Sequence, residues 1–167
     1  MDFQIRNARP DDAPEIVRVF NPIINAGIYT VLDAPLTVES QRAYIAGLSS
    51  RAIFNLAEST IDGSVMGFQS MEPYPDQYSH AFDHVGVIGT WVDLNFHRKG
   101  VAKSLFRATF EVAPRKGYEK IFTYIRADNP VALATYESQG FRIVGRAHRQ
   151  AKLHGRYIDE VIVERML

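Results

Sequence analysis

One stretch of the sequence places small and basic residues where an apolar run leads into a helix. The apolar run covers residues 85–92, and the segment His97-Arg98-Lys99-Gly100-Val101-Ala102-Lys103 follows it. The first backbone N–H groups of a helix have no partner inside the helix, and the helix dipole favours negative charge there. Gly100 and Ala102 would let the backbone approach an anion. This segment predicts a pyrophosphate site, with an ordinary strand-to-helix turn as the alternative.

Two common phosphate-binding motifs do not fit this segment. A P-loop needs four residues between its first glycine and Gly-Lys-Ser/Thr, and residues 100–104 have a different spacing and no second glycine. The dinucleotide fingerprint G-x-G-x-x-G does not occur in the chain. The phosphate would therefore rest on the helix start itself.

A second segment, residues 129–141, combines helix signals with a tyrosine. Asn129 is a good N-cap, Pro130 suits the first helical position, and Gly140 would end the helix. Ala132 and Tyr136 lie one turn apart on the same face, so a narrow strip there could accept a ligand with the phenol at its end. The alternative is that Asn129 only caps the helix and Tyr136 only packs.

The remaining candidates for chemistry are weaker. The chain contains no cysteine, which excludes disulfides, thiolate zinc sites and a cysteine nucleophile. His80 and His84 are four residues apart, but they fall where a loop and a strand are expected and no H-E-x-x-H accompanies them. We therefore predict no metal site.

Composition narrows the class of protein further. The length of 167 residues predicts a single domain spanning 1–167. Lys plus Arg and Asp plus Glu are both 19, so the net charge is zero and a nucleic-acid partner is not expected. No apolar run approaches the roughly 20 residues that span a bilayer, and no signal peptide is recognised. We expect a cytoplasmic protein with no membrane association.

The predicted elements alternate in a way that is typical of a mixed sheet with helices on its faces. The dipeptide Asp62-Gly63 predicts a hairpin between two antiparallel strands, and Pro22 is expected to bend or end the first helix. Thr37 is a plausible N-cap of the second helix. We predict strands at 3–8, 52–59, 64–71, 84–93, 120–126, 141–148 and 157–166, and helices that start at 10 and 37 and cover 100–113 and 129–139.

Taken together, the two informative segments resemble the GNAT superfamily of acetyl-CoA-dependent N-acetyltransferases. Residues 97–102 match the pattern Gln/Arg-x-x-Gly-x-Gly/Ala, with His97 in place of Gln or Arg. Asn129, Ala132 and Tyr136 match the later pattern of Asn, a small residue and Tyr. The resemblance implies an α/β (α+β) fold with a mixed, mostly antiparallel central sheet and helices on both faces. The segments similar to the phosphinothricin acetyltransferase-like branch are 20–21, 29–30, 35–37 and 155–159.

The resemblance also implies roles for particular residues. Acetyl-CoA would be the co-substrate, Asn129 would reach its pantetheine arm, and Tyr136 would act as general acid toward the departing thiolate. The thioester and pantetheine would bond to the strand edge at Thr90, Trp91 and Val92. The pyrophosphate would rest on the amides of His97, Arg98, Lys99, Gly100, Val101, Ala102 and Lys103.

The general base is left open by the sequence. An amine of pKa about 10.4 is almost fully protonated at pH 7, so a base or a water chain must remove a proton before attack. The related branch often carries a Glu on the central strand, where this chain has Val87. The candidates are His84, favoured because a histidine titrates near neutrality, Glu72, or a chain of waters.

The predicted function is acetyl transfer to the primary amine of a small molecule, an amino acid or an analogue. Without a cysteine, no acetyl-cysteine intermediate can form, so direct transfer in a ternary complex is expected. Loops carrying Tyr29, Tyr74 and Tyr78 would suit an aromatic-walled pocket. The alternatives are an acyl-CoA-sensing module without turnover and a protein N-terminal or lysine acetyltransferase. The resemblance also implies a homodimer, to which residues 161–163 would contribute unless they belong to the core.

Overall fold

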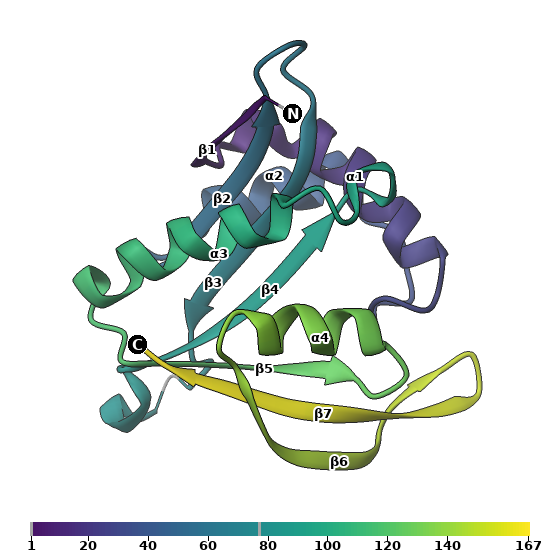
Figure 1. Ribbon diagram of the computed structural model, residues 1–167, viewed down its shortest axis with the longest axis vertical. Helices are drawn as coiled ribbons and strands as arrows, with labels where there is room; N and C mark the ends of the chain where they lie inside the picture. Colours follow the sequence, from purple (N-terminus) through teal and green to yellow (C-terminus); the bar gives the residue numbers. More distant parts are fainter. Residues whose placement is uncertain (1, 77) are drawn as a thin grey trace.

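The computed structural model describes residues 2–76 and 78–167 and contains one sheet with the strand order β1-β2-β3-β4-β5-β7-β6 (Figure 1). Every neighbouring pair is antiparallel except β4 and β5, which are parallel. The strands are β1 Phe3–Asn7, β2 Ile53–Ser59, β3 Val65–Pro73, β4 Val85–Val92, β5 Lys120–Arg126, β6 Arg142–Leu153 and β7 Arg156–Met166. The helices are α1 Ala13–Asn25, α2 Val38–Ala46, α3 Val101–Val112 and α4 Pro130–Ser138. The mixed, mostly antiparallel fold with helices on both faces is confirmed.

The helices divide between the two faces of the sheet. In Figure 1, α3 and α4 lie in front of the sheet, and α1 and α2 lie behind it. Burial of the apolar stripe of α1 against β2 and β3 forms one core, which includes Ile16, Phe20 and Phe68. A second core lies under α3 and α4. The apolar sides of α1 and α3 are therefore covered by the sheet.

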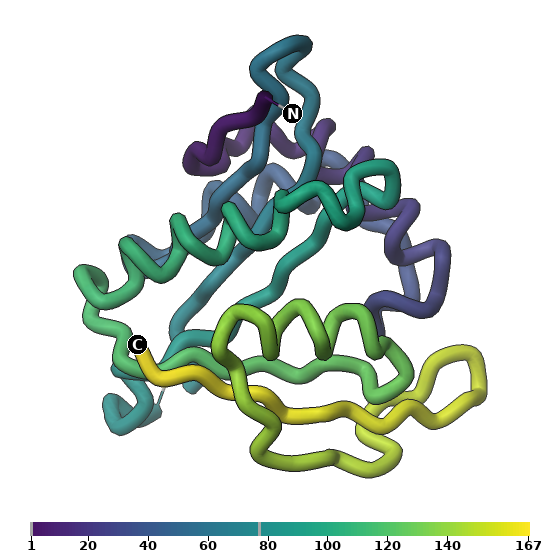
Figure 2. Tube along the Cα trace, in the orientation of Figure 1, coloured from purple at the N-terminus to yellow at the C-terminus, as the bar shows by residue number. Residues whose placement is uncertain are grey.

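The sheet opens in its middle, between the two parallel strands. β4 pairs with β5 only from Val85 to Val87, opposite Lys120 to Phe122, while β3 follows β4 as far as Val92. Beyond Val87 the two strands diverge, as the teal and green traces of Figure 2 show. Residues 88–92 therefore have a strand partner on one side only, and their other edge presents unpaired backbone N–H and C=O groups.

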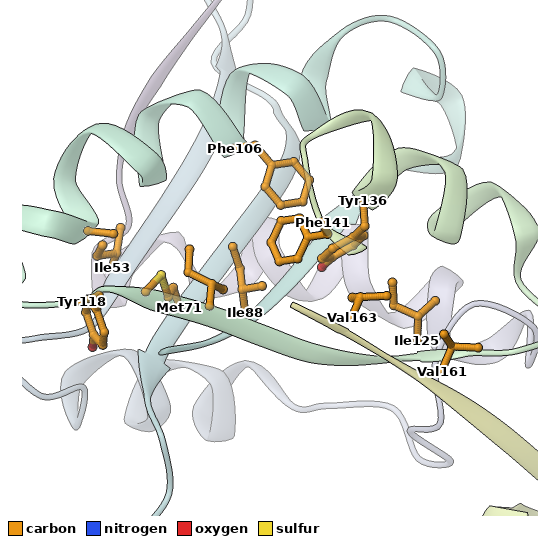
Figure 3. Packing of buried hydrophobic residues seen from close by; sticks show 12 residues of the cluster. Ile53, Met71, Ile88, Phe106, Tyr118, Ile125, Tyr136, Phe141, Val161 and Val163 are labelled. Atoms are coloured by element: carbon orange, nitrogen blue, oxygen red, sulfur yellow. The ribbon is translucent and has the colours of Figure 1, made fainter. Parts of the chain in front are cut away.

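Tyr136 occupies the wedge that this divergence creates on the α3 and α4 side. Its ring meets Phe106 and Phe141 edge to face, with ring centroids 5.0 Å apart in both pairs (Figure 3). Val161 and Val163 are buried in the same core. Val161 and Val163 therefore belong to the core, the alternative to a role in a dimer interface.

Local sequence signals set several element boundaries. The Thr37 hydroxyl accepts the N–H of Ser40 at 3.0 Å, which confirms Thr37 as the N-cap of α2. Pro22 does not end the first helix, because α1 continues past it to Asn25. The predicted strand 141–148 runs on to Leu153, since its polar residues pair with β7 across a bulge.

A chain of buried polar side chains crosses the core and ends at the open edge of β4. The amide of Asn55 donates to the Thr109 hydroxyl at 3.1 Å, and that hydroxyl donates to Gln69 Oε1 at 2.5 Å. Gln69 Nε2 in turn donates to the Thr90 hydroxyl at 2.8 Å. Buried polar groups are costly unless they are paired, so each member of this chain depends on the next. The chain joins β2, α3, β3 and β4.

We expect Thr109→Val to destabilise the fold by about 2 to 4 kcal/mol, because it leaves the Asn55 amide and Gln69 Oε1 without their partner in the core. Urea unfolding measures the free energy of unfolding. Thr60→Val, an exposed site outside any strand, is the control and is expected to change it by less than about 0.5 kcal/mol. Equal effects of the two variants would contradict the role of the polar chain.

Candidate active site

Tyr136 presents its hydroxyl at the open edge of β4. The residue is 6% exposed, and its hydroxyl donates to Thr90 Oγ1 at 3.3 Å. Burial raises the pKa of Tyr136 to about 12, while the hydrogen bond to Thr90 opposes the rise. The side chain is therefore a neutral phenol at physiological pH and can act as a hydrogen-bond donor.

A cavity of about 710 Å³ begins at this hydroxyl and fills the space behind the opening of the sheet. Gly89, Thr90 and Trp91 line it from β4, and Ala132 and Tyr136 line it from α4. The structure therefore brings the predicted strip of Ala132 and Tyr136 to the same cavity as the strand edge. Cavities of this size hold small ligands.

Aromatic side chains form part of the walls of the cavity. The indole of Trp91 packs against Phe20 and Phe68, with ring centroids 4.8 and 5.1 Å apart. It also covers Gly89, where a Cβ atom would collide with the indole ring. The indole can lie against the backbone of β4 only because Gly89 has no side chain.

Of the three tyrosines expected to line the cavity, the structure places only Tyr29 there. Tyr29 lines the cavity, but Tyr74 packs on Phe82 and Phe122 outside it. Tyr78 is 91% exposed. The expectation for Tyr74 and Tyr78 is therefore wrong: Pro73 and Pro75 line the cavity, but the side chain of Tyr74 between them packs on Phe82 and Phe122.

The predicted anion site is a loop of left-handed turns that leads into α3. Arg98 has φ 60° and Gly100 has φ 82°, and α3 begins at Val101. Alternating backbone conformations of this kind point successive N–H groups toward one centre, and the first N–H groups of α3 add to them. Val101, the first residue of α3, is buried, and Ala102 follows it in the helix. The loop can hold an anion through its backbone alone.

The basic side chains of this loop do not converge on one point. His97 Nε2 lies 3.2 Å from the carbonyl of Val92, and the His97 ring meets Tyr29 edge to face at 5.9 Å. The Lys99 ammonium lies over the Phe96 ring at 5.0 Å. His97 therefore ties the loop to the end of β4.

Lys103 faces a different hollow, a groove of about 550 Å³ between α3 and the end of α4. Arg107 and Arg165 line the same groove. The positive charge near the start of α3 is thus spread over two surfaces.

Asn129 has two local partners. Its side-chain oxygen accepts the N–H of Ala132 at 3.1 Å, which caps α4, and its amide donates to the carbonyl of Tyr29 at 3.5 Å. The residue is buried. Asn129 fixes the start of α4 against the Tyr29 loop. It therefore helps to position Tyr136, which lies on the same helix.

The candidate bases differ in location. His84 is exposed, precedes β4 and does not line the cavity. Glu72 lines the cavity from β3, opposite Val87, and accepts a hydrogen bond from the Tyr44 hydroxyl. The structure therefore brings Glu72, and not His84, into the same cavity as Tyr136.

Two further charged residues of the cavity lie outside every motif that the sequence offers. Arg126 and Glu160 face each other across β5 and β7 and both line the cavity. No short motif contains them, since they are brought together only by strand pairing. Successive side chains of a strand point to opposite faces of the sheet, so Arg126 and Glu160 could be assigned to the cavity face only once the pairing of β5 with β7 was known.

Among residues 2–76 and 78–167, no group of three or more His, Cys, Asp or Glu side chains is placed to hold a metal ion. Within that same part of the chain, no helix has the length and hydropathy needed to cross a membrane.

The family model described as "Acetyltransferase (GNAT) family" matches residues 26–141, and the chain belongs to that family. The chain is 29% identical over 107 residues to the L-amino acid N-acetyltransferase AaaT of Escherichia coli (strain K12). The matched segment covers 64% of this chain and 64% of that relative.

Solved structures of the same fold cover nearly the whole chain. A GCN5-related N-acetyltransferase from Kribbella flavida is 27% identical, with a TM-score of 0.84 over 99% of this chain and 98% of that one. A phosphinothricin acetyltransferase from Sinorhizobium meliloti, solved in complex with AcCoA, is 18% identical, with a TM-score of 0.89 over 100% of this chain and 89% of that one. The fold is that of GNAT acetyltransferases.

We expect Gly100→Val to weaken acetyl-CoA binding at least about tenfold, because a branched residue at a left-handed position would rearrange the loop before α3. Gly155→Val is the matched control: Gly155 has φ 80°, but it lies in the turn between β6 and β7. Calorimetric titration measures both dissociation constants. Equal binding by the two variants would show that the loop does not hold the co-substrate.

Proposed function

We propose that this chain transfers the acetyl group of acetyl-CoA directly to the primary amine of a small molecule, an amino acid or an analogue of one. The observation that carries the proposal is the buried Tyr136 hydroxyl at the open edge of β4, inside a cavity with aromatic walls. The activity for which the Escherichia coli relative is named supports an amino acid or a related amine as the acceptor. The size of the cavity supports a small molecule over a polypeptide.

The chain has surfaces that fit each part of the co-substrate. The left-handed loop at Arg98 and Gly100 offers backbone donors for a pyrophosphate. The unpaired edge of residues 88–92 offers N–H and C=O groups to an extended amide chain. The thioester would then lie beside Thr90 and Tyr136, at the mouth of the cavity.

The movement of protons during acetyl transfer requires a hydrogen-bond donor near the sulfur, and Tyr136 is proposed for this role. When the amine nitrogen bonds to the carbonyl carbon, the C–S bond breaks, the nitrogen loses a proton and the sulfur gains one. The pKa of about 12 for Tyr136 lies about 3.5 units above that of a typical thiol, about 8.5. Tyr136 is therefore expected to donate a hydrogen bond to the sulfur as negative charge develops, and this bond lowers the barrier.

Thr90 keeps the Tyr136 hydroxyl in place before reaction. Thr90 Oγ1 accepts from both Tyr136, at 3.3 Å, and Gln69, at 2.8 Å. The Gln69 bond belongs to the buried polar chain that ends on Thr109 and Asn55. The donor is thus positioned from within the core, and little reorganisation is needed when the sulfur arrives.

Glu72 is the proposed base, acting on the amine directly or through a water. It lines the cavity on the acceptor side of β4, and the Tyr44 hydroxyl holds its carboxylate. A carboxylate within reach of the bound ammonium can accept its proton. The exposed position of His84 at the far end of β4 argues against that residue.

We also propose that residues 1–167 act as one domain, in the cytoplasm and as a homodimer. One sheet contains all the strands of the described residues, which supports a single unit.

The edge strand β6 supports the proposed homodimer. Ile143 and Val144 on this strand are half exposed, and an exposed apolar edge strand favours pairing with a second copy. The location remains a prediction from the sequence.

Incubation with acetyl-CoA and a panel of small amines, with detection of the free thiol and of the acetylated product, tests the proposal. Thiol release with at least one amine is expected. Binding of acetyl-CoA without transfer to any amine would indicate a sensing module instead. Label found on lysate proteins, and on no small amine, would indicate a protein acetyltransferase.

We expect Tyr136→Phe to lower kcat about 100-fold and to leave the dissociation constant for acetyl-CoA within about twofold, since the phenyl ring still fills the wedge. Tyr118→Phe is the control, because Tyr118 is also buried but donates to the carbonyl of Arg51, outside the cavity. Steady-state kinetics and calorimetry measure the two effects. A wild-type kcat in Tyr136→Phe would refute the assigned role.

The two candidate bases are separated by Glu72→Gln and His84→Gln. We expect Glu72→Gln to lower kcat about 100-fold and His84→Gln to leave kcat unchanged. The reverse pattern would assign the base to His84. Loss in neither variant would assign the proton to a water chain.

A further inference from the structure

The acceptor cavity is lined by more acidic than basic side chains. Among the described residues that line it, Glu72 and Glu160 are acidic, and Arg126 is the one Lys, Arg or His side chain. Any acceptor that enters must therefore find its charge partners among these three groups.

Arg126 is already occupied by the protein itself. Its Nε and Nη2 atoms donate to the Asp128 carboxylate, both at 2.8 Å, and Nη1 donates to the carbonyls of Gly27 at 2.7 Å and Thr30 at 3.0 Å. The hydrogen bonds from Arg126 lower the pKa of Asp128, so the pair is ionised and mutually neutralised. The Arg126 side chain is 6% exposed. Four of its five N–H donors are thus bound within the protein, where they tie β5 to the Tyr29 loop, and its charge is already paired with that of Asp128.

Glu160 is in the opposite situation. It is 9% exposed and lines the cavity, yet its carboxylate makes no hydrogen bond or ion pair with any of the described residues. Burial raises the pKa of Glu160, and the positive charge of Arg126 only partly opposes this. The Glu160 carboxylate is therefore open to the cavity and has no partner among the described side chains, so a ligand cation placed against it would gain a charge-assisted hydrogen bond.

The two carboxylates lie on opposite sides of the opening in the sheet. Glu72 is on β3, opposite Val87 of β4, whereas Glu160 is on β7, opposite Arg126 of β5. The reacting position at Thr90 and Tyr136 lies at the opening between them. An acceptor with cationic groups at two points along its length would match this arrangement, and a carboxylate would face acidic groups without a free cation.

We propose that the acceptor is a diamine-type molecule, a primary amine that carries a second cationic group and no free carboxylate, with the second cation bound by Glu160. This inference rests on the proposed acetyl transfer and narrows its acceptor to amino acid analogues that lack the acid group. Glu72 receives the amine that reacts, and Glu160 selects the molecule by its other end. The acceptor binds in the space that Trp91, Tyr29 and Tyr124 enclose.

Three amines of matched length test the proposal in the wild-type chain. Cadaverine differs from lysine only by the missing carboxylate, and pentylamine differs from cadaverine only by the missing second amine. We expect kcat/KM for cadaverine to exceed those for lysine and for pentylamine by at least about tenfold. The reason is that cadaverine adds one buried charge-assisted hydrogen bond relative to pentylamine and avoids one charge repulsion relative to lysine.

The variant Glu160→Gln tests whether Glu160 binds the second cationic group of the acceptor. It is expected to reduce the preference for cadaverine over pentylamine at least about fivefold through KM, with acetyl-CoA binding unchanged. Glu137→Gln is the matched control, because Glu137 is an exposed carboxylate on α4 outside the cavity, and it is expected to keep the preference. The midpoint of thermal unfolding confirms that both variants are folded.

The outcomes separate this inference from the proposed function. Turnover of lysine or of pentylamine at a rate equal to that of cadaverine overturns the inference and leaves acetyl transfer in place. An unchanged preference in a folded Glu160→Gln also overturns it. Absence of thiol release with every amine, although acetyl-CoA binds, overturns acetyl transfer and the inference together.

Discussion

The early separation of β4 from β5 is the constraint on which the rest of the structure depends. Parallel strands normally continue to pair, but here the pairing ends after Val87, and residues 88–92 keep only their β3 neighbour. The separation leaves a row of unpaired backbone groups, a wedge for a side chain from α4 and a cavity on the other face. An open sheet edge inside a protein is costly unless it is covered or bound by a ligand. The unpaired edge of β4 is thus best understood as a binding surface that its ligand completes.

The packing around this opening explains how one phenol is held at the reacting position. The rings of Phe106 and Phe141 fix Tyr136 from above and from the side, while Thr90 and Gln69 fix its hydroxyl from the sheet. Aromatic contacts set the direction of the ring, and the polar chain sets the direction of the O–H bond. A phenol is already neutral near pH 7, and burial raises the pKa of Tyr136 further, to about 12. The core under α3 and α4 therefore fixes the position of a hydroxyl that remains a hydrogen-bond donor.

The sequence predicts those features that depend on neighbouring residues. Gly100 as the turn before α3, Thr37 as an N-cap and Tyr136 one turn from Ala132 all follow from local spacing, and the structure contains each of them. Features that need long-range contacts could not be found in this way. Arg126 and Glu160 meet only through the pairing of β5 with β7, and the left-handed turn at Arg98 has no glycine to announce it. The placement of His84 outside the cavity depends on where β4 begins relative to its opening, which no motif specifies.

A crystal structure of the chain with bound acetyl-CoA tests the central claim most directly. The thioester sulfur is expected within hydrogen-bonding distance of the Tyr136 hydroxyl, with the pantetheine along the free edge of residues 88–92. The pyrophosphate is expected on the backbone amides of the loop at Arg98 and Gly100. A sulfur atom held away from Tyr136, or a pyrophosphate bound instead in the groove of Lys103, Arg107 and Arg165, would contradict the claim.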